Sequence, residues 1–224
     1  SKYDELETTG TGFNFKFGVI YRITDWVRIG AALHTPTFFN NMNDEWQSSM
    51  RSSLNNGESY SWSSPLGAYD YELETPMKLL GNIAFVIGSH GLISADYEYI
   101  DYTKARLRSD DDYGFFDEND AIENLYTYAH NIRIGTEWRL KPLSFRAGYA
   151  YYGSPYESGV NDGDKSSISL GIGIRGKYYF ADFAYTHTSY DEDYYPYSSA
   201  STIAQPVLNE FSKNNFLLTI GMNF

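Results

Sequence analysis

The sequence has 224 residues, a formal net charge of −12 and no cysteine. The acidic balance argues against nucleic-acid binding, and the absence of cysteine excludes disulfide bonds and thiol chemistry. The chain has no run of about 18 apolar residues, which excludes a transmembrane helix. A search for long apolar runs does not detect a membrane β-barrel, because the lipid-facing and lumen-facing residues of its strands alternate. No basic segment followed by an apolar one begins the chain, so we expect a mature chain or a fragment.

Alternation of apolar and polar residues with a period of two recurs along the chain and predicts β-strands. In the first such segment, Phe13, Phe15 and Phe17 alternate with Asn14 and Lys16. The pattern predicts nine strands, at residues 13–23, 27–34, 69–87, 93–108, 131–139, 143–151, 168–175, 179–186 and 215–224. Residues 1–10 are polar and show no periodicity.

The predicted connections alternate strictly between short turns and long loops. The short turns lie at residues 24–25, 88–91, 141–142 and 176–177. The long loops lie at residues 37–68, where we expect a short helix near 43–54, and at 109–125, 153–165 and 189–212. Outer-membrane barrels have short periplasmic turns and long extracellular loops, so the short turns are predicted to lie in the periplasm.

One face of the predicted strands is almost entirely Phe, Ile, Leu, Val, Ala and Tyr, and small and charged residues share the other. A soluble β-sandwich or barrel with this pattern would expose a very large apolar surface to water. The sequence therefore predicts an all-β fold, an antiparallel transmembrane β-barrel. Because nine is odd, the first strand begins on the opposite side from the end of the last. We therefore expect part of a larger barrel, in which strand 215–224 pairs with 178–188 and not with 12–23.

Six segments resemble the FadL family of outer-membrane transporters for hydrophobic compounds. They are TDWVRIGAALHTP (24–36), LETPMKLLGNIAF (73–85), LISADYEYIDYTKAR (92–106), HNIRIGTEWRL (130–140), LSFRAGYAYYGSPY (143–156) and the closing strand. The resemblance implies a fourteen-stranded barrel, of which residues 1–224 form the last nine strands in a single incomplete domain without the amino-terminal hatch. It also implies a location in the bacterial outer membrane.

The resemblance implies a carrier of hydrophobic molecules, such as long-chain fatty acids or aromatic hydrocarbons. Two alternatives stay open, a structural subunit of a larger outer-membrane complex and a general porin. The expected partners are outer-membrane lipid and lipopolysaccharide, the hydrophobic ligand, and other outer-membrane proteins. The aromatic carboxyl terminus, Phe224, resembles the signal that the outer-membrane assembly machinery reads.

A carboxylate ligand would need one or two cations in the lumen. The inward-facing residues Arg133 and Arg146 are the best placed pair, and Lys78 is a third candidate. The alternative is a ladder of salt bridges that neutralises charge across the lumen wall. Pro76 interrupts a predicted strand, where it marks either a local bulge or a gap in the wall.

The sequence shows no motif for catalysis or for a cofactor. The four histidines are scattered without metal-ligand spacing, and no nucleophile–base pair or phosphate loop is present, so we expect neither an enzyme nor a cofactor. The acidic runs 110–112 and 191–193 could hold Ca²⁺, but neither has the regular ligand spacing of an EF-hand. Solvated loops are the favoured interpretation.

Overall fold

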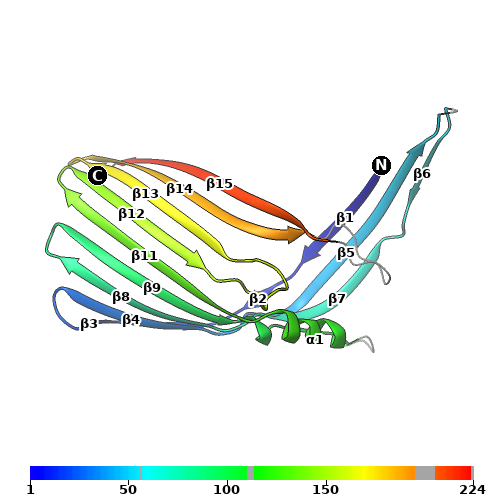
Figure 1. Ribbon diagram of the computed structural model, residues 1–224, viewed down its shortest axis with the longest axis horizontal. Helices are drawn as coiled ribbons and strands as arrows, with labels where there is room; N and C mark the ends of the chain where they lie inside the picture. Colours follow the sequence, from blue (N-terminus) through cyan, green and yellow to red (C-terminus); the bar gives the residue numbers. More distant parts are fainter. Residues whose placement is uncertain (56, 110–113, 195–204, 223–224) are drawn as a thin grey trace.

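A nine-stranded antiparallel sheet forms most of the structure, a computed structural model that describes residues 1–55, 57–109, 114–194 and 205–222 (Figure 1). The strand order is β15-β14-β13-β12-β11-β9-β8-β4-β3, which confirms the nine predicted strands. Their bounds are β3 (Lys16–Arg22), β4 (Val27–His34), β8 (Lys78–Ile87), β9 (Gly91–Asp101), β11 (Tyr128–Leu140), β12 (Leu143–Tyr152), β13 (Lys165–Arg175), β14 (Tyr179–Tyr194) and β15 (Val207–Met222).

The register keeps apolar residues on one face of this sheet. Across neighbouring strands, Ile29 lies opposite Ile83, Ile83 opposite Ala95, Ala95 opposite Ile134, and Ile134 opposite Tyr149. A slip of one residue in any pair would move a whole strand's apolar set to the other face, so the alternation specifies the register.

The four short turns gather at one end of the sheet, where β15 also ends (Figure 1). They join β3 to β4, β8 to β9, β11 to β12 and β13 to β14. In the first turn, the Thr24 hydroxyl accepts hydrogen bonds from the backbone N–H groups of Trp26 and Val27 at 3.3 and 3.1 Å. The residues that close these turns were all predicted from the sequence.

A second sheet extends from the opposite end and was largely missed by the sequence patterns. Its strands are β1 (Lys2–Thr9), β2 (Gly12–Phe13), β5 (Phe38–Ser53), β6 (Ser59–Ser63), β7 (Gly67–Glu74) and β10 (Arg106–Arg108). The prediction of a loop at 37–68 with a helix near 43–54 is wrong, because β5 is a strand of 16 residues. Residues 1–10, which lack periodicity, also form a strand.

Polar side chains hold this extension together in place of an apolar face. The hydroxyl of Thr8 donates to Asp44 at 2.6 Å, and that of Ser48 donates to Asp4 at 2.6 Å. Pairing with neighbouring strands has overridden the low strand propensity of the Asn- and Ser-rich sequence.

Four successive strands are interrupted at the same level, along a line that we call the seam (residues 14–15, 35–37, 75–77 and 102–105). The predicted single strand 69–87 is therefore two strands, β7 and β8, since Pro76 has no N–H for the ladder. Predicted strand 93–108 is likewise divided, into β9 and β10 by the short 3₁₀-helix η1 (Tyr102–Lys104).

Threonine side chains bridge the seam beside Pro76. The Thr37 N–H donates to the Thr75 hydroxyl at 2.9 Å, and the Thr75 N–H donates to the Thr37 carbonyl at 3.0 Å. These bonds keep the strands together, which favours a local interruption over a gap in the wall at Pro76.

The described parts of two predicted long loops contain regular elements that the sequence does not predict. Helix α1 (Phe116–Leu125) lies in the predicted acidic loop, with Asp117 and Glu118 in its positively polarised first turn. The Asn119 side chain fixes α1 to β10 through two hydrogen bonds with the backbone of Leu107, at 2.8 and 2.9 Å. In the predicted loop 189–212, β14 continues to Tyr194 and β15 already begins at Val207.

Within the described ranges, no helix is long and apolar enough to cross a membrane.

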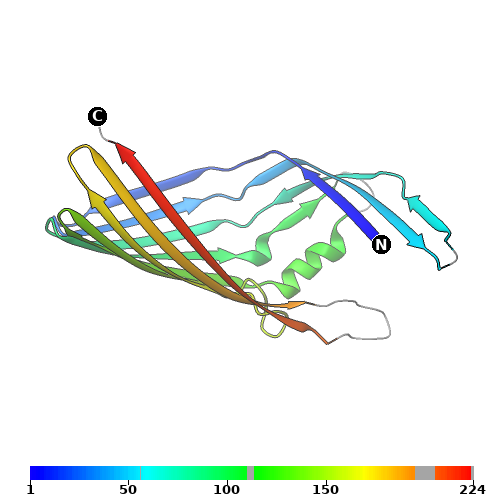
Figure 2. The same ribbon diagram turned by 90° about the horizontal axis from the view of Figure 1, so that it is seen from above.

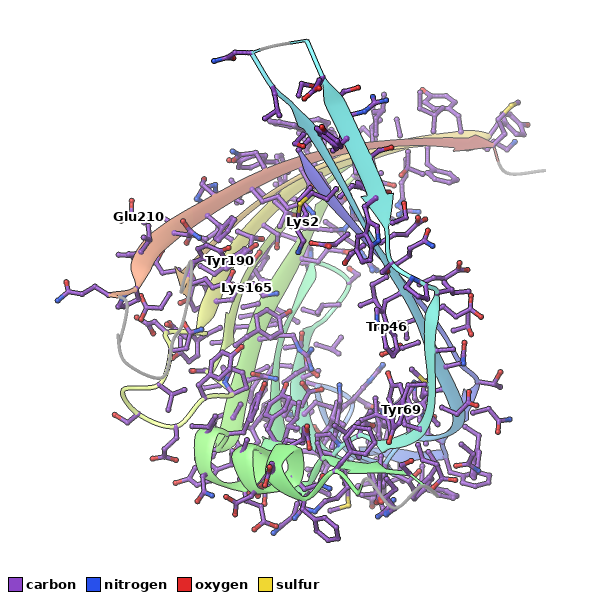
Figure 3. The ribbon with its side chains drawn as sticks, turned by 90° about the vertical axis from the view of Figure 1, so that its right-hand side faces the viewer. Lys2, Trp46, Tyr69, Lys165, Tyr190 and Glu210 are labelled. Atoms are coloured by element: carbon purple, nitrogen blue, oxygen red, sulfur yellow. The ribbon has the colours of Figure 1, made fainter. Side chains whose placement is uncertain are left out.

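The two edge strands of the nine-stranded sheet are β3 and β15, and in the described residues they do not pair with each other. As predicted, β15 pairs with β14. The sheet is strongly curved, as Figure 2 shows from above. In the view along the long axis, Lys165 and Tyr190 lie on the wall opposite Trp46 and Tyr69 (Figure 3).

Candidate functional site

Side chains crowd together on the polar face of the nine-stranded sheet, as expected of a concave surface. Glu98, Ile100, Ala129, Asn131 and Ser144 are buried there. Large apolar side chains on the other face are exposed, among them Phe17, Val19, Ile134, Leu170, Phe216 and Ile220. We call the polar face the inner face and the apolar face the outer face.

Five charged residues form a continuous ion-pair ladder across the inner face. Glu137 on β11 binds Arg139 at 2.6 Å and Arg146 on β12 at 2.8 Å. Arg146 also binds Asp182 on β14 at 2.7 Å, and Asp182 lies 3.6 Å from Arg175 on β13. A carboxylate thus lies between each pair of neighbouring cations, which is the ladder arrangement weighed as an alternative for Arg146.

Glycines on β13 make this ladder possible. Gly171 lies beside Arg146 in the register, so the guanidinium can pass over β13 to reach Asp182 on the next strand. A Cβ atom at Gly173 would collide with the Asp182 carboxylate and would lie only 2.7 Å from the Ser144 hydroxyl. The missing side chains leave space in which Asp182 meets Arg146.

Arg133 belongs to a separate polar cluster. Its guanidinium lies 3.6 Å from the carboxylate of Glu98, a residue that is only 8% exposed. The Asn131 amide donates to the same carboxylate at 2.8 Å, and its carbonyl oxygen accepts from the Gly153 N–H at 3.2 Å. Arg133 therefore contributes to neutralising a buried acid on β9.

Arg133 and Arg146 line the same open groove, which has a volume of about 610 Å³. They do not face each other, because the pair Gly135–Gly148 lies between their positions in the register of β11 and β12. These glycines form part of the groove floor. The groove offers two cations at separate points, each already paired with acids, and ligand binding by Arg133 and Arg146 stays a prediction.

Lys78 lies in a different place, at the seam. It lies opposite His34 on β4 and Ile100 on β9, and it lines a cavity of about 370 Å³. His34 in turn lies opposite Lys16 on β3. The alternation predicts that Lys16, His34 and Lys78 all face inward, but only the register shows that they are neighbours.

Aromatic residues lie near both ends of the outer face. Trp26 stacks on Phe85 with ring centroids 6.2 Å apart beside the short turns, where Trp138 also lies. Near the other end, the Tyr97 hydroxyl lies 2.5 Å from the His130 ring nitrogen, and Tyr99 and Tyr128 pack around the same histidine. Such belts are typical of the two membrane–water interfaces.

The predicted acidic runs show no metal-binding arrangement in the described residues. No group of three or more His, Asp or Glu residues there could hold a metal ion. Residues 191–193 lie in β14 and pair with β15, whereas 110–112 and Phe224 lie outside the described residues.

In loop 153–164, burial raises the pKa of the Asp164 carboxyl, and Asp162 raises it further through a hydrogen bond and its charge.

The fold defines the class of this protein as an antiparallel membrane-type β-barrel sheet with an apolar outer face. The toluene transporter TodX of P. putida matches with a TM-score of 0.60 and 14% identity, over 96% of this chain and 50% of TodX. The Ralstonia pickettii toluene transporter TbuX matches with a TM-score of 0.56 and 16% identity, over 94% of this chain and 48% of TbuX. The monoaromatic hydrocarbon channel CymD matches with a TM-score of 0.55 and 14% identity, over 80% of this chain and 47% of CymD.

These likenesses confirm the FadL-type barrel fold that the sequence predicts. The chain spans about half the length of the three structures. Neither the protein-family models nor the curated protein sequences gave a match.

Proposed function

We propose that this chain belongs to an outer-membrane channel of the FadL type, through which hydrophobic compounds cross. The observation that carries the proposal is the shared fold with TodX, a toluene transporter, over nearly the whole chain. The apolar outer face supports a location in the outer membrane, because it would be a large exposed apolar surface in water. The scaffold and general-porin alternatives have no specific observation in their favour.

We propose that the hydrophobic compound moves along the inner face of the nine-stranded sheet through the groove of about 610 Å³. Its floor contains Gly135, Gly148 and Gly171. Small residues in the floor leave room for an apolar molecule. The ion-pair ladder crosses the same wall with a carboxylate between each pair of neighbouring cations. The long connections and the extension would lie outside the cell, and the short turns in the periplasm.

The test is toluene flux into lipid vesicles that contain the full-length protein. We expect flux above that of empty vesicles, whereas sucrose, a polar solute, should not enter. Entry of sucrose at a comparable rate would favour a general porin, and absence of toluene flux would contradict the proposal.

A matched pair of variants tests the groove itself. A Cβ at Gly135 has its nearest neighbour at 3.8 Å, so a side chain can begin there without a clash, and Gly135→Phe is designed to occupy the groove. Gly81→Phe places the same ring on the outer face, where no atom lies within 4 Å of the added Cβ. Toluene flux should fall severalfold in the first variant only. Equal flux in both would show that the groove is not the path.

A further inference from the structure

Three basic residues form one cross-strand row on the inner face at the seam. Lys16 on β3 lies opposite His34 on β4, and His34 lies opposite Lys78 on β8. The two lysines are therefore two strands apart, or about 10 Å between backbones. All three line the cavity of about 370 Å³. We call Lys16, His34 and Lys78 the basic row.

The basic row has no acidic counterpart in the described part of the chain. No described carboxylate lies within ion-pair distance of Lys16 or Lys78, although every arginine in the ladder has one. The nearest acid along the register, Glu98, is taken by Arg133 and Asn131. The positive charges of Lys16 and Lys78 repel each other across the intervening strand β4, and an anion between them would relieve the repulsion.

The cavity beside the row supplies neutral donors as well. The Thr37 hydroxyl accepts a hydrogen bond from the Asn14 amide at 2.8 Å, and the Thr75 hydroxyl accepts one from the Thr37 N–H at 2.9 Å. A hydroxyl that accepts one bond still has its own proton to donate. Both threonines line the cavity, so their protons can point toward a ligand.

The remaining walls of the cavity are apolar and aromatic. Phe39, Pro76, Ile100 and Tyr102 line it. Its volume is at the lower end of the range of small-molecule sites, about 300–1,000 Å³, so the ligand that fits is smaller than a typical drug molecule. The site thus combines two ammonium groups with a compact apolar enclosure.

We propose that the basic row binds the carboxylate of a compact organic acid, whose body is one aromatic ring or a short alkyl chain. Lys16 and Lys78 neutralise the carboxylate, His34 and the threonine hydroxyls donate to it, and the apolar walls cover its body. The inference rests on the proposed function, because it makes such acids cargo of the channel in addition to neutral hydrocarbons.

Binding of radiolabelled benzoate to the full-length protein in lipid nanodiscs tests this site. We expect saturable binding that Lys16→Gln with Lys78→Gln weakens at least about tenfold, the effect of losing a charge-assisted hydrogen bond. Lys141→Gln with Lys177→Gln makes the same charge change at two short turns and should leave binding unchanged. Lys16→Arg with Lys78→Arg should retain most of the affinity. All four lysines are exposed, and circular dichroism checks that each variant folds.

The outcomes separate this inference from the proposed function. Equal benzoate affinity in wild type and the Lys16 and Lys78 glutamine variant would overturn the inference, as would absence of benzoate binding in a protein that carries toluene. Displacement of benzoate by inorganic phosphate as effectively as by unlabelled benzoate would also overturn it, since the apolar walls would then contribute nothing. Lysine-dependent benzoate binding without toluene flux would support the site and contradict the proposed function.

Discussion

The inner face contains two groups of cations on strands of the same sheet. The first group is paired with carboxylates, and the second is not paired with any described carboxylate. In the ladder on β11 to β14, Arg146 lies between two carboxylates at 2.7 and 2.8 Å. In the basic row on β3, β4 and β8, Lys16 and Lys78 have no described carboxylate within reach. An inward cation can therefore be paired with acids of the wall or lack a carboxylate partner among the described residues, depending on which residues the register places beside it.

Removal of the central cation of the ladder should have the largest effect on stability. Arg146→Met leaves Glu137 and Asp182 half-buried without their shared partner. Breaking a fully buried ion pair costs 3–5 kcal/mol, and since these groups are partly hydrated we expect a loss of about 2 kcal/mol. Urea unfolding followed by tryptophan fluorescence measures it. A loss below about 0.5 kcal/mol would show that the ladder is not structural.

A methyl group on β13 should disturb the same ladder without changing any charge. Gly173→Ala collides with the Asp182 carboxylate, so we expect a loss of about 1–2 kcal/mol in the same unfolding assay. Gly171→Ala is the matched control on the same strand and face, because its Cβ would lie 3.5 Å from Arg146, an ordinary contact. Equal stability of the two variants would contradict the steric account.

Removal of a cation from the basic row should not lower the free energy of unfolding. Lys16→Gln removes one of two like charges, so the free energy of unfolding should stay within about 0.5 kcal/mol of wild type or rise slightly. The comparison would break down if Lys16→Gln destabilised the protein as much as Arg146→Met. That result would mean that the lysine has a structural partner.

The smallest effect is expected in the loop before β13, where Asp162 and Asp164 lie close together. The pKa of Asp164 is raised in the folded protein, so the fold binds this proton more tightly than the unfolded chain does. Stability is therefore lost as the pH rises through the usual aspartate pKa, and the loss is complete above the raised value. Asp164→Asn should stabilise the protein slightly at neutral pH. The gain should vanish as the pH falls below the usual aspartate pKa, and unfolding curves at neutral and acidic pH will show whether it does.

The nine strands could be predicted because each carries its own apolar alternation. Strand β5 could not, since its side chains are satisfied by hydrogen bonds to β1 and β7, as between Asn43 and Asp70 at 2.8 Å. Helix α1 was not predicted either, because hydrogen bonds between the Asn119 side chain and the Leu107 backbone hold it in place, and not an apolar stripe.

The face of the sheet on which the candidate site residues lie could be predicted from the sequence, but the residues that they contact could not. Alternation placed Arg133, Arg146 and Lys78 on the inner face. Pairing of Arg146 with Asp182 depends on a contact across an intervening strand. That no described carboxylate lies within ion-pair distance of Lys78 depends on the register of three strands. Neither can be obtained from the periodicity of a single segment.

The glycine at 173 also constrains the order in which this wall can change during evolution. A side chain at position 173 would collide with the Asp182 carboxylate. A larger residue at 173 is therefore tolerated only after Asp182 has been replaced by a smaller residue. Loss of Asp182 in turn removes one of the two carboxylates that hold Arg146. Positions 146, 173 and 182, distant in sequence, should therefore vary together among descendants of this chain, with 182 changing before 173.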